Sequence, residues 1–277
     1  MIMTKEKILK ILLSVFKTQN FDVDTECKND RWSADVIVNC GTYKVALNIC
    51  KSPRNVAETY KTMRKERVCG CWLLMSKKYD ISIPNDMPCF ELSEQSDGIY
   101  VYLNSDFEDE SLNMVRLDAF ILSLIKGNIK FVQNMCVRYI EVCFFKTECW
   151  KCHKDFHVYF IKRLLSSDGV PIIQCDDDFN DMFEFKPMVI NAVEQFVKVH
   201  PEIGVRMGKI KQHFSKTRNE YYPSFGCTFC DSLYGNYYYK DDVNELIYCQ
   251  LPEYRIEIPK GIDVSVKRWY KKKDEPN

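Results

Sequence analysis

The first part of the chain carries apolar residues at the three- and four-residue spacing of an amphipathic helix. This spacing predicts a helix over about residues 4 to 18 with one buried face. Its apolar positions are Ile8, Leu9, Ile11, Leu12, Val15 and Phe16. Charged residues are interleaved with these positions and no small-residue cleavage site follows, so we expect an amphipathic helix and not a secretory signal.

Short runs of alternating or β-branched residues come next and predict three strands that form a meander. These runs are 21–25, 33–38 and 43–50. After Pro53, good helix formers extend from Val56 to Glu66, and the apolar run 71–75 is typical of a buried strand. The expected order α-β-β-β-α-β describes a mixed α/β core.

Prolines and acidic clusters interrupt the hydrophobic pattern and divide the rest of the chain into segments. Prolines near residue 84 and an acidic cluster at 106–110 precede a predicted helix at 111–126, which we expect to bridge two domains. Beyond residue 137 the chain becomes rich in paired cysteines, with an insertion that holds an acidic run at 176–178 and a helix-like segment at 189–199. The expected parts are an α/β domain at 1–105, a helical connector at 106–136, a cysteine-containing α+β domain at 137–262 and a basic tail at 263–277.

Composition narrows the classes of protein. The 277 residues are 46% hydrophobic, which is an ordinary globular balance and suits two domains. Lys+Arg and Asp+Glu are equal at 39 each, so no global charge draws the protein toward nucleic acid or a membrane. No apolar run approaches the roughly 20 residues of a membrane span. Most of the 14 cysteines stand singly in apolar runs, so we expect buried thiols in a soluble, cytoplasmic protein.

Two Cys-x-x-Cys pairs are the sharpest chemical signal. Cys149 and Cys152 form the first, and Cys227 and Cys230 form the second. Each such turn lets two thiolates face one point, and two turns supply the four soft ligands of tetrahedral zinc. Loop-closure entropy grows only slowly with length, so a long insertion between the pairs is tolerated. The sequence therefore predicts one structural Zn²⁺ site in a split zinc ribbon.

Other readings of the first pair stay open. The run from Cys149 to His153 matches the attachment pattern of a c-type haem, and a Cys-x-x-Cys pair can also be a redox dithiol. A local site of two cysteines with His153 and His157 is a further alternative. Four thiolates would leave no open coordination position, so we expect no catalysis at the metal.

Three segments of the N-terminal part carry a family resemblance. They are Ser33-Ala34-Asp35-Val36, the strand 45–50 with the following Lys51-Ser52-Pro53, and the strand that contains Trp72. Together they resemble the nuclease-like domain of competence protein CoiA and its relatives, which have the PD-(D/E)XK nuclease fold. The second knuckle, with the Phe214–Thr217 segment before it, is similar to the same group. The resemblance implies a restriction-endonuclease-like mixed sheet for the N-terminal domain.

The same resemblance implies a catalytic pair that this chain lacks. Relatives carry an acidic residue on the third strand and a Lys or Gln two positions later, whereas this chain has Asn48 and Cys50 there. An amide and a thiol suit Mg²⁺ poorly, so Asp35 has lost its partners. A rearranged catalytic site with Mg²⁺ remains an alternative, and we expect Asp35 otherwise to pair with Arg31. The candidate catalytic residues are Asp35, Glu26, Glu58 and Lys51.

Three functions follow as hypotheses. The first is a catalytically degenerate, zinc-binding protein that binds nucleic acid, with cations for phosphates and an aromatic ring for bases. The residues expected to do so are Lys267, Arg268, Trp269, Lys271 and Lys272. The alternatives are an active metal-dependent DNA nuclease and a protein-interaction scaffold in a phage-conflict or mobile-element system. DNA or another protein is the expected partner, with no membrane and no small-molecule cofactor.

Overall fold

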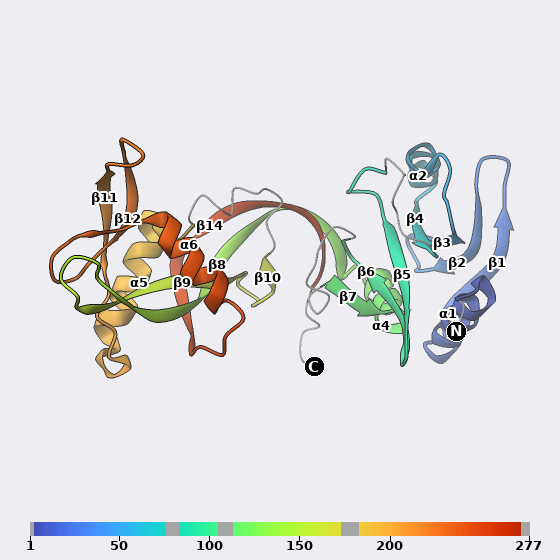
Figure 1. Cartoon of the computed structure of the whole chain (residues 1–277). Helices are drawn as coiled ribbons and strands as arrows, with labels where there is room; N and C mark the ends of the chain where they lie inside the picture. The colour runs from blue at the N-terminus through green and yellow to red at the C-terminus, as the bar shows by residue number, and fades with distance from the viewer. Residues whose placement is uncertain (1–2, 76–82, 105–112, 173–182, 273–277) are drawn as a thin grey trace. The chain divides into compact units, whose positions relative to one another are not determined.

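The computed structural model describes residues 3–75, 83–104, 113–172 and 183–272. The acidic runs at 106–110 and 176–178, together with Lys273, lie outside these residues. The chain divides into two compact units (Figure 1). The first comprises Met1–Gln133 with Lys267–Asn277, and the second comprises Asn134–Val266. Among the described helices, none combines the length and the hydropathy that a membrane crossing requires.

A seven-stranded mixed sheet, in the order β1 to β7, forms the first unit. Pairing is parallel between β3 and β4 and between β4 and β5, and antiparallel elsewhere. The predicted order α-β-β-β-α-β is confirmed by the first six elements, and the class is mixed α/β. The elements are α1 (Lys5–Thr18), β1 (Asp22–Lys28), β2 (Ser33–Asn39), β3 (Lys44–Cys50), α2 (Val56–Lys65), β4 (Val68–Leu74), β5 (Cys89–Gln95), β6 (Gly98–Tyr102), β7 (Met114–Arg116) and α4 (Leu117–Ile125).

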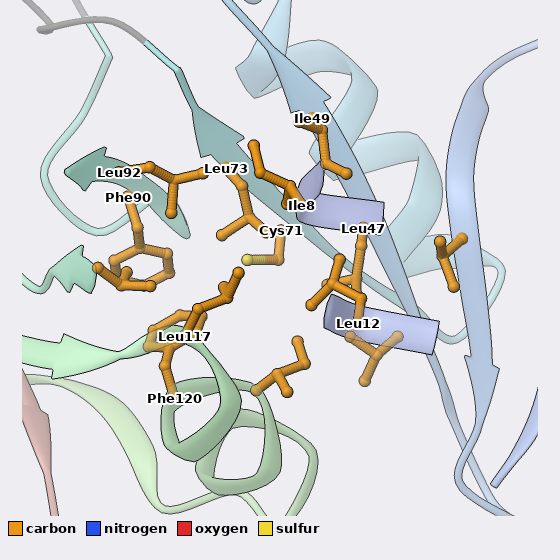
Figure 2. Close-up of a cluster of buried hydrophobic side chains, with 14 of the residues drawn as sticks. Ile8, Leu12, Leu47, Ile49, Cys71, Leu73, Phe90, Leu92, Leu117 and Phe120 are labelled. Atoms are coloured by element: carbon orange, nitrogen blue, oxygen red, sulfur yellow. The ribbon is translucent and has the colours of Figure 1, made fainter. Parts of the chain in front are cut away.

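Two apolar clusters hold this sheet. The larger joins α1 and α4 to side chains of β2 to β6, and the smaller joins α2 to β4 through residues such as Met63 and Trp72. Figure 2 shows the larger cluster, in which the labelled side chains of α1, β3, β4, β5 and α4 point toward one another. Ile8 and Leu12, both predicted to lie on the apolar face of the first helix, are fully buried there.

The division of the chain differs from the predicted one at two places. The helix expected to bridge two domains begins at Leu117, and its Leu117, Phe120 and Ile121 are buried in the core of the first unit. The predicted connector is therefore corrected, since that helix completes a core. The predicted tail at 263–277 is also corrected, because strand β14 (Glu253–Lys271) extends through most of it.

The second unit contains two sheets, ordered β10-β9-β8-β14 and β11-β12-β13. Its core includes an aromatic cluster in which Phe225 lies 5.3 Å from Tyr159, 5.4 Å from Phe185 and 5.5 Å from Tyr239, measured between ring centroids. The predicted helix at 189–199 is confirmed by α5. The elements are β8 (Ile129–Glu148), β9 (Asp155–Leu165), β10 (Pro171–Ile172), η2 (Phe183–Phe185), α5 (Pro187–Val199), η3 (Pro201–Ile203), β11 (Lys209–Ser215), β12 (Glu220–Gly226), β13 (Leu233–Tyr234) and α6 (Asn236–Leu246).

Candidate metal centre

Each Cys-x-x-Cys pair occupies the turn of an antiparallel hairpin. The first turn joins β8 to β9, with Glu148 opposite Asp155 in the ladder. The second joins β12 to β13, with Gly226 opposite Leu233. The two turns therefore have the same length, and each places its first cysteine directly after the last paired residue of a strand. Two equivalent hairpin tips are the scaffold of the candidate site.

Backbone N–H groups point at the first sulfur of each turn. The N–H of Lys151 donates to Cys149 Sγ, and the N–H of Phe229 donates to Cys227 Sγ, both at 3.4 Å. The backbone of both turns thus directs an N–H donor at the first sulfur in the same way.

The residue after the second cysteine closes each turn with a left-handed backbone. His153 has φ 55° and Asp231 has φ 57°. Their N–H groups donate to the carbonyl oxygens of Cys149 and Cys227, at 2.9 and 2.8 Å. Neither residue is glycine, although this conformation costs a side-chain-bearing residue free energy. The same strained closure at both tips keeps each pair of sulfurs turned inward.

The four sulfurs converge, as the sequence predicts. All four Sγ atoms lie within 4.8 Å of one another. Cys149 Sγ is 3.5 Å from Cys230 Sγ, and Cys152 Sγ is 3.6 Å from Cys227 Sγ. A tetrahedron with Zn–S bonds of ~2.3 Å has S···S edges of about 3.8 Å, whereas a disulfide bond measures about 2.05 Å. The spacing therefore suits four ligands of one metal ion, and the prediction that these cysteines meet is confirmed.

Electrostatics at the cluster differ between sulfurs. Hydrogen bonds from the hydroxyl and the backbone of Ser232 lower the pKa of Cys230 to about 6. At Cys152 the backbone N–H of Lys154 acts to lower the pKa, but burial and hydrogen bonds with the other three thiols outweigh it and raise the pKa to about 12. The contrast arises because the thiols are closely spaced. Once one of them has lost its proton, its negative charge opposes deprotonation of a neighbouring thiol.

The neighbouring histidines are not part of the cluster. His153 Nδ1 lies 2.9 Å from a carboxylate oxygen of Glu148 on the exposed surface. His157 Nδ1 accepts the backbone N–H of Arg206 at 3.1 Å. Among the described residues, one group of three or more His, Cys, Asp or Glu side chains is close enough to hold one metal ion. The four cysteines are this group, and neither histidine belongs to it. The two-cysteine, two-histidine alternative is therefore wrong, and the haem and dithiol readings leave the second pair unexplained.

Residues around the turns hold the two hairpins in place, and the sequence alone did not single them out. Trp150 Nε1, from the first turn, donates to the carbonyl oxygen of Leu233 beyond the second, at 3.0 Å. Thr228 Oγ1 donates to the carbonyl oxygen of Met207 at 2.8 Å. Their signal in the sequence is weak, because an exposed Trp or Thr in a turn has no periodic pattern to mark it.

A serine, a histidine and an aspartate also meet beside the second turn. His213 Nδ1 is 3.0 Å from Ser224 Oγ, and His213 Nε2 is 3.5 Å from Asp231 Oδ1. Ser224 is fully buried, so no substrate reaches its hydroxyl. This arrangement supports the second hairpin and is not a nucleophilic site.

The fold and the site define a mixed α/β protein of two units, of which the second carries a four-cysteine centre able to hold a metal ion. Comparison of the chain with models of protein families, with curated proteins and with solved structures found no match. The function is therefore argued from the geometry of this chain's own residues.

Asp35, the first candidate catalytic residue, has a partner at each carboxylate oxygen. Lys5 Nζ lies 2.6 Å from Oδ1, and the backbone N–H of Ile49 donates to Oδ2 at 2.7 Å. The expected pairing of Asp35 with Arg31 is wrong, since Arg31 lies 3.6 Å from a carboxylate oxygen of Glu66. Asp35 thus ties α1 and β3 to β2.

The other three candidate catalytic residues are exposed. Glu26 is on β1 with φ 53°, at a break in the ladder opposite Asp35. Lys51 follows the end of β3, and Glu58 is in the first turn of α2. Within the described part of the chain, Asp35, Glu26 and Glu58 do not gather into a group that could hold a metal. Asn48 Nδ2, at the position of the lost acid, is buried and has no hydrogen-bond partner.

The basic residues near the C-terminus belong to a strand. Lys267, Arg268, Lys271 and the ring of Trp269 lie on β14, and Lys272 follows it. The Trp269 ring packs edge-on against Phe90, with the centroids 5.1 Å apart, and its Nε1 donates to the carbonyl oxygen of Asn85 at 2.8 Å. The Trp269 ring is thus partly buried against the core of the first unit, and its stacking on bases stays a prediction.

Replacing Asp35 by alanine is expected to lower the free energy of unfolding of the first unit by about 1–3 kcal/mol, because the N–H of buried Ile49 loses its acceptor. The ion pair with Lys5 adds little, since Lys5 is exposed. Urea denaturation would measure the change, with Asp24→Ala, an exposed carboxylate on β1, as the control. Wild-type stability in Asp35→Ala would contradict the structural role.

Proposed function

We propose that the protein is a non-catalytic zinc protein that binds nucleic acid, with the four cysteines holding one structural Zn²⁺. The convergence of Cys149, Cys152, Cys227 and Cys230 carries the zinc half of this proposal. Soft thiolates in a tetrahedral set favour zinc or an iron–sulfur centre over hard cations such as Mg²⁺. The S···S distances suit a single ion, and four protein ligands leave no position for a reacting water.

Elemental analysis of the purified chain is expected to give about one zinc per protein. Cys152→Ser should lower this content, because it removes one of four ligands, whereas Cys249→Ser should not, because Cys249 is exposed and outside the cluster. Iron in place of zinc, or equal zinc content in the two variants, would contradict the assignment.

Exposed aromatic side chains of the second unit support the nucleic-acid half of the proposal. Trp150 is 70% exposed, Tyr237 77% and Tyr238 65%. Bases of nucleic acids stack on exposed aromatic rings of this kind. Exposed lysines follow in the same segments, including Lys151 and Lys240. These features offer an expected contact surface in addition to the basic residues near the C-terminus.

A filter-binding titration across a salt series tests this half. Affinity for nucleic acid should fall as salt rises, because bound phosphates release counterions. No binding, or binding that ignores salt, would leave the chain as a zinc protein of another kind, with a protein-interaction scaffold as the alternative.

An active nuclease is the competing function, and the contacts of Asp35 speak against it. Both of its carboxylate oxygens have partners within the protein, and Lys5 already supplies a positive charge beside it. The resemblance to the CoiA nuclease-like domain stays a prediction about the fold of the N-terminal domain. We expect no cleavage of linear, nicked or single-stranded DNA with Mg²⁺ or Mn²⁺; cleavage that Asp35→Ala abolishes would favour the enzyme.

A further inference from the structure

A large open cleft lies beside the four-cysteine centre within the second unit. Its volume is about 1180 Å³, which exceeds the ~300–1,000 Å³ of most small-molecule sites. Five aromatic side chains line it together with the cations Arg218 and Lys240. The aromatic residues are Trp150, Tyr222, Tyr234, Tyr237 and Tyr238. The size and the openness of the cleft suit a segment of a polymer better than an enclosed metabolite.

Three separate segments build this cleft. Trp150 comes from the first cysteine turn, Arg218 and Tyr222 from the β11–β12 hairpin, and Tyr237 from the start of α6, which follows β13. The bond from Trp150 Nε1 to the carbonyl oxygen of Leu233 fixes the indole across the two hairpins. The cleft therefore exists only while the two cysteine turns are held together.

Two pairs of lining side chains are packed against each other. Tyr237 and Tyr238 are edge-to-face with their centroids 5.6 Å apart, so their ring planes are nearly perpendicular. The Arg218 guanidinium lies over the Tyr222 ring, 5.2 Å from its centroid. An Arg stacked on a ring adds a flat cationic surface, which bases and phosphates both contact favourably.

The carboxylates of the cleft are already engaged within the protein. Glu148 pairs with His153, and Asp242 accepts a hydrogen bond from the Tyr234 hydroxyl. Arg218 pairs with Glu220 through Nε at 2.6 Å. Exposed Lys151 and Lys216 directly adjoin the lining residues Trp150 and Thr217 in the chain. The cations that line the cleft itself are Arg218 and Lys240, and their combination with aromatic rings is typical of proteins that bind single strands.

We propose that this cleft binds unpaired bases of a single-stranded nucleic acid, which stack on Trp150, Tyr237 and Tyr238 while Lys240 and Arg218 meet the phosphates. The proposal rests on the proposed nucleic-acid function and adds its site and its strand preference. Only unpaired bases offer their faces to side-chain rings, so a duplex is a poorer ligand. Zinc acts indirectly, since it holds the turns that carry the rings.

Fluorescence anisotropy with the zinc-loaded full chain tests the site. The probes are a labelled oligothymidylate and an oligouridylate of about 15 nucleotides, and a duplex of the same length. The wild type should prefer the single strands. Trp150→Ala and the double variant Tyr237→Ala/Tyr238→Ala should each bind roughly 5- to 150-fold more weakly per lost stack. Trp150→Phe keeps a ring and should retain most of the affinity.

Tyr248→Ala is the matched control, because Tyr248 is an exposed tyrosine of the same unit outside the cleft. Its affinity should equal that of the wild type, and zinc content should be equal in all variants, which shows that they are folded. If the wild type binds with salt dependence but the cleft variants bind equally well, the cleft assignment is overturned and the proposed function stands. If the wild type binds no nucleic acid, both fail; binding of a proline-rich peptide that Trp150→Ala abolishes would then make the cleft a peptide site.

Discussion

Replacing Cys227 by serine is expected to unfold the second unit and to leave the first unit folded. Cys227 is 1% exposed and contributes one of the four converging sulfurs. Structural zinc sites contribute roughly 10–16 kcal/mol of apparent binding free energy, which is comparable with or larger than the whole stability of a domain, about 5–15 kcal/mol. Loss of one thiolate removes much of that contribution and leaves three buried or half-buried thiols without their ion.

The separate core of the first unit is the reason that it should survive. Its apolar cluster is built from α1, α4 and strands of its own sheet. The four cysteines of the candidate metal centre all belong to the second unit. Hydrogen exchange with mass spectrometry would locate the change, and protection should fall across β9, β12 and α6 but not across β3 and β4. Chelation of the wild-type metal should reproduce the pattern.

Cys249→Ser is the control, because Cys249 is an exposed thiol in the same unit. It should keep wild-type protection throughout. A Cys227→Ser protein with an intact second unit would mean that the aromatic cluster around Phe225 is sufficient by itself. Loss of protection in both units would mean that their folding is coupled.

Replacing Phe120 by alanine is expected to lower the free energy of unfolding of the first unit by about 3–5 kcal/mol without changing the zinc content. Phe120 is fully buried in α4, and its ring centroid lies 4.9 Å from that of Phe90. Truncation removes the transfer free energy of the ring and leaves a cavity among Leu117, Phe90 and the residues of α1 (Figure 2).

Urea denaturation followed by near-ultraviolet circular dichroism, with zinc measured on the same sample, would test this. Leu13→Ala is the control, because Leu13 is 38% exposed on α1 and should change the stability by only about 0.5 kcal/mol or less. A small effect of Phe120→Ala would mean that α4 is the loosely packed connector that the sequence predicts, and not part of the core.

Local pattern predicted the first six elements in their order and two later helices, but none of the strands β5 to β14. The spacing of Ile8, Leu12 and Phe16 specified α1, and the β-branched runs specified β2 and β3, because periodicity reports which face of an element is buried. It predicted a helix at 111–126 but not that this helix, α4, belongs to the core of the first unit. That helix is apolar, and its sequence does not distinguish a connector between domains from a core helix, because the difference depends on which residues pack against it.

The candidate sites also include features that the sequence predicts and features that it does not. The chemistry of the thiols could be predicted, because two Cys-x-x-Cys turns have few other uses in one chain. The role of Asp35 could not, since Lys5 is distant in sequence and only the packing of α1 against the sheet brings it to the carboxylate. The position of Trp269 could not be predicted either. The basic and aromatic run around it indicates a free tail, whereas the Trp269 ring packs against Phe90.

By itself the sequence determined the types and order of the first six elements and the four cysteines that could hold a metal, because periodicity and ligand chemistry are local properties. Tertiary structure alone decided that the four sulfurs lie within 4.8 Å, that Asp35 is held by Lys5, and that Trp150 and Tyr237 line one cleft. These are contacts between residues far apart in the chain. Their geometry depends on how strands pair and helices pack, which no local pattern encodes.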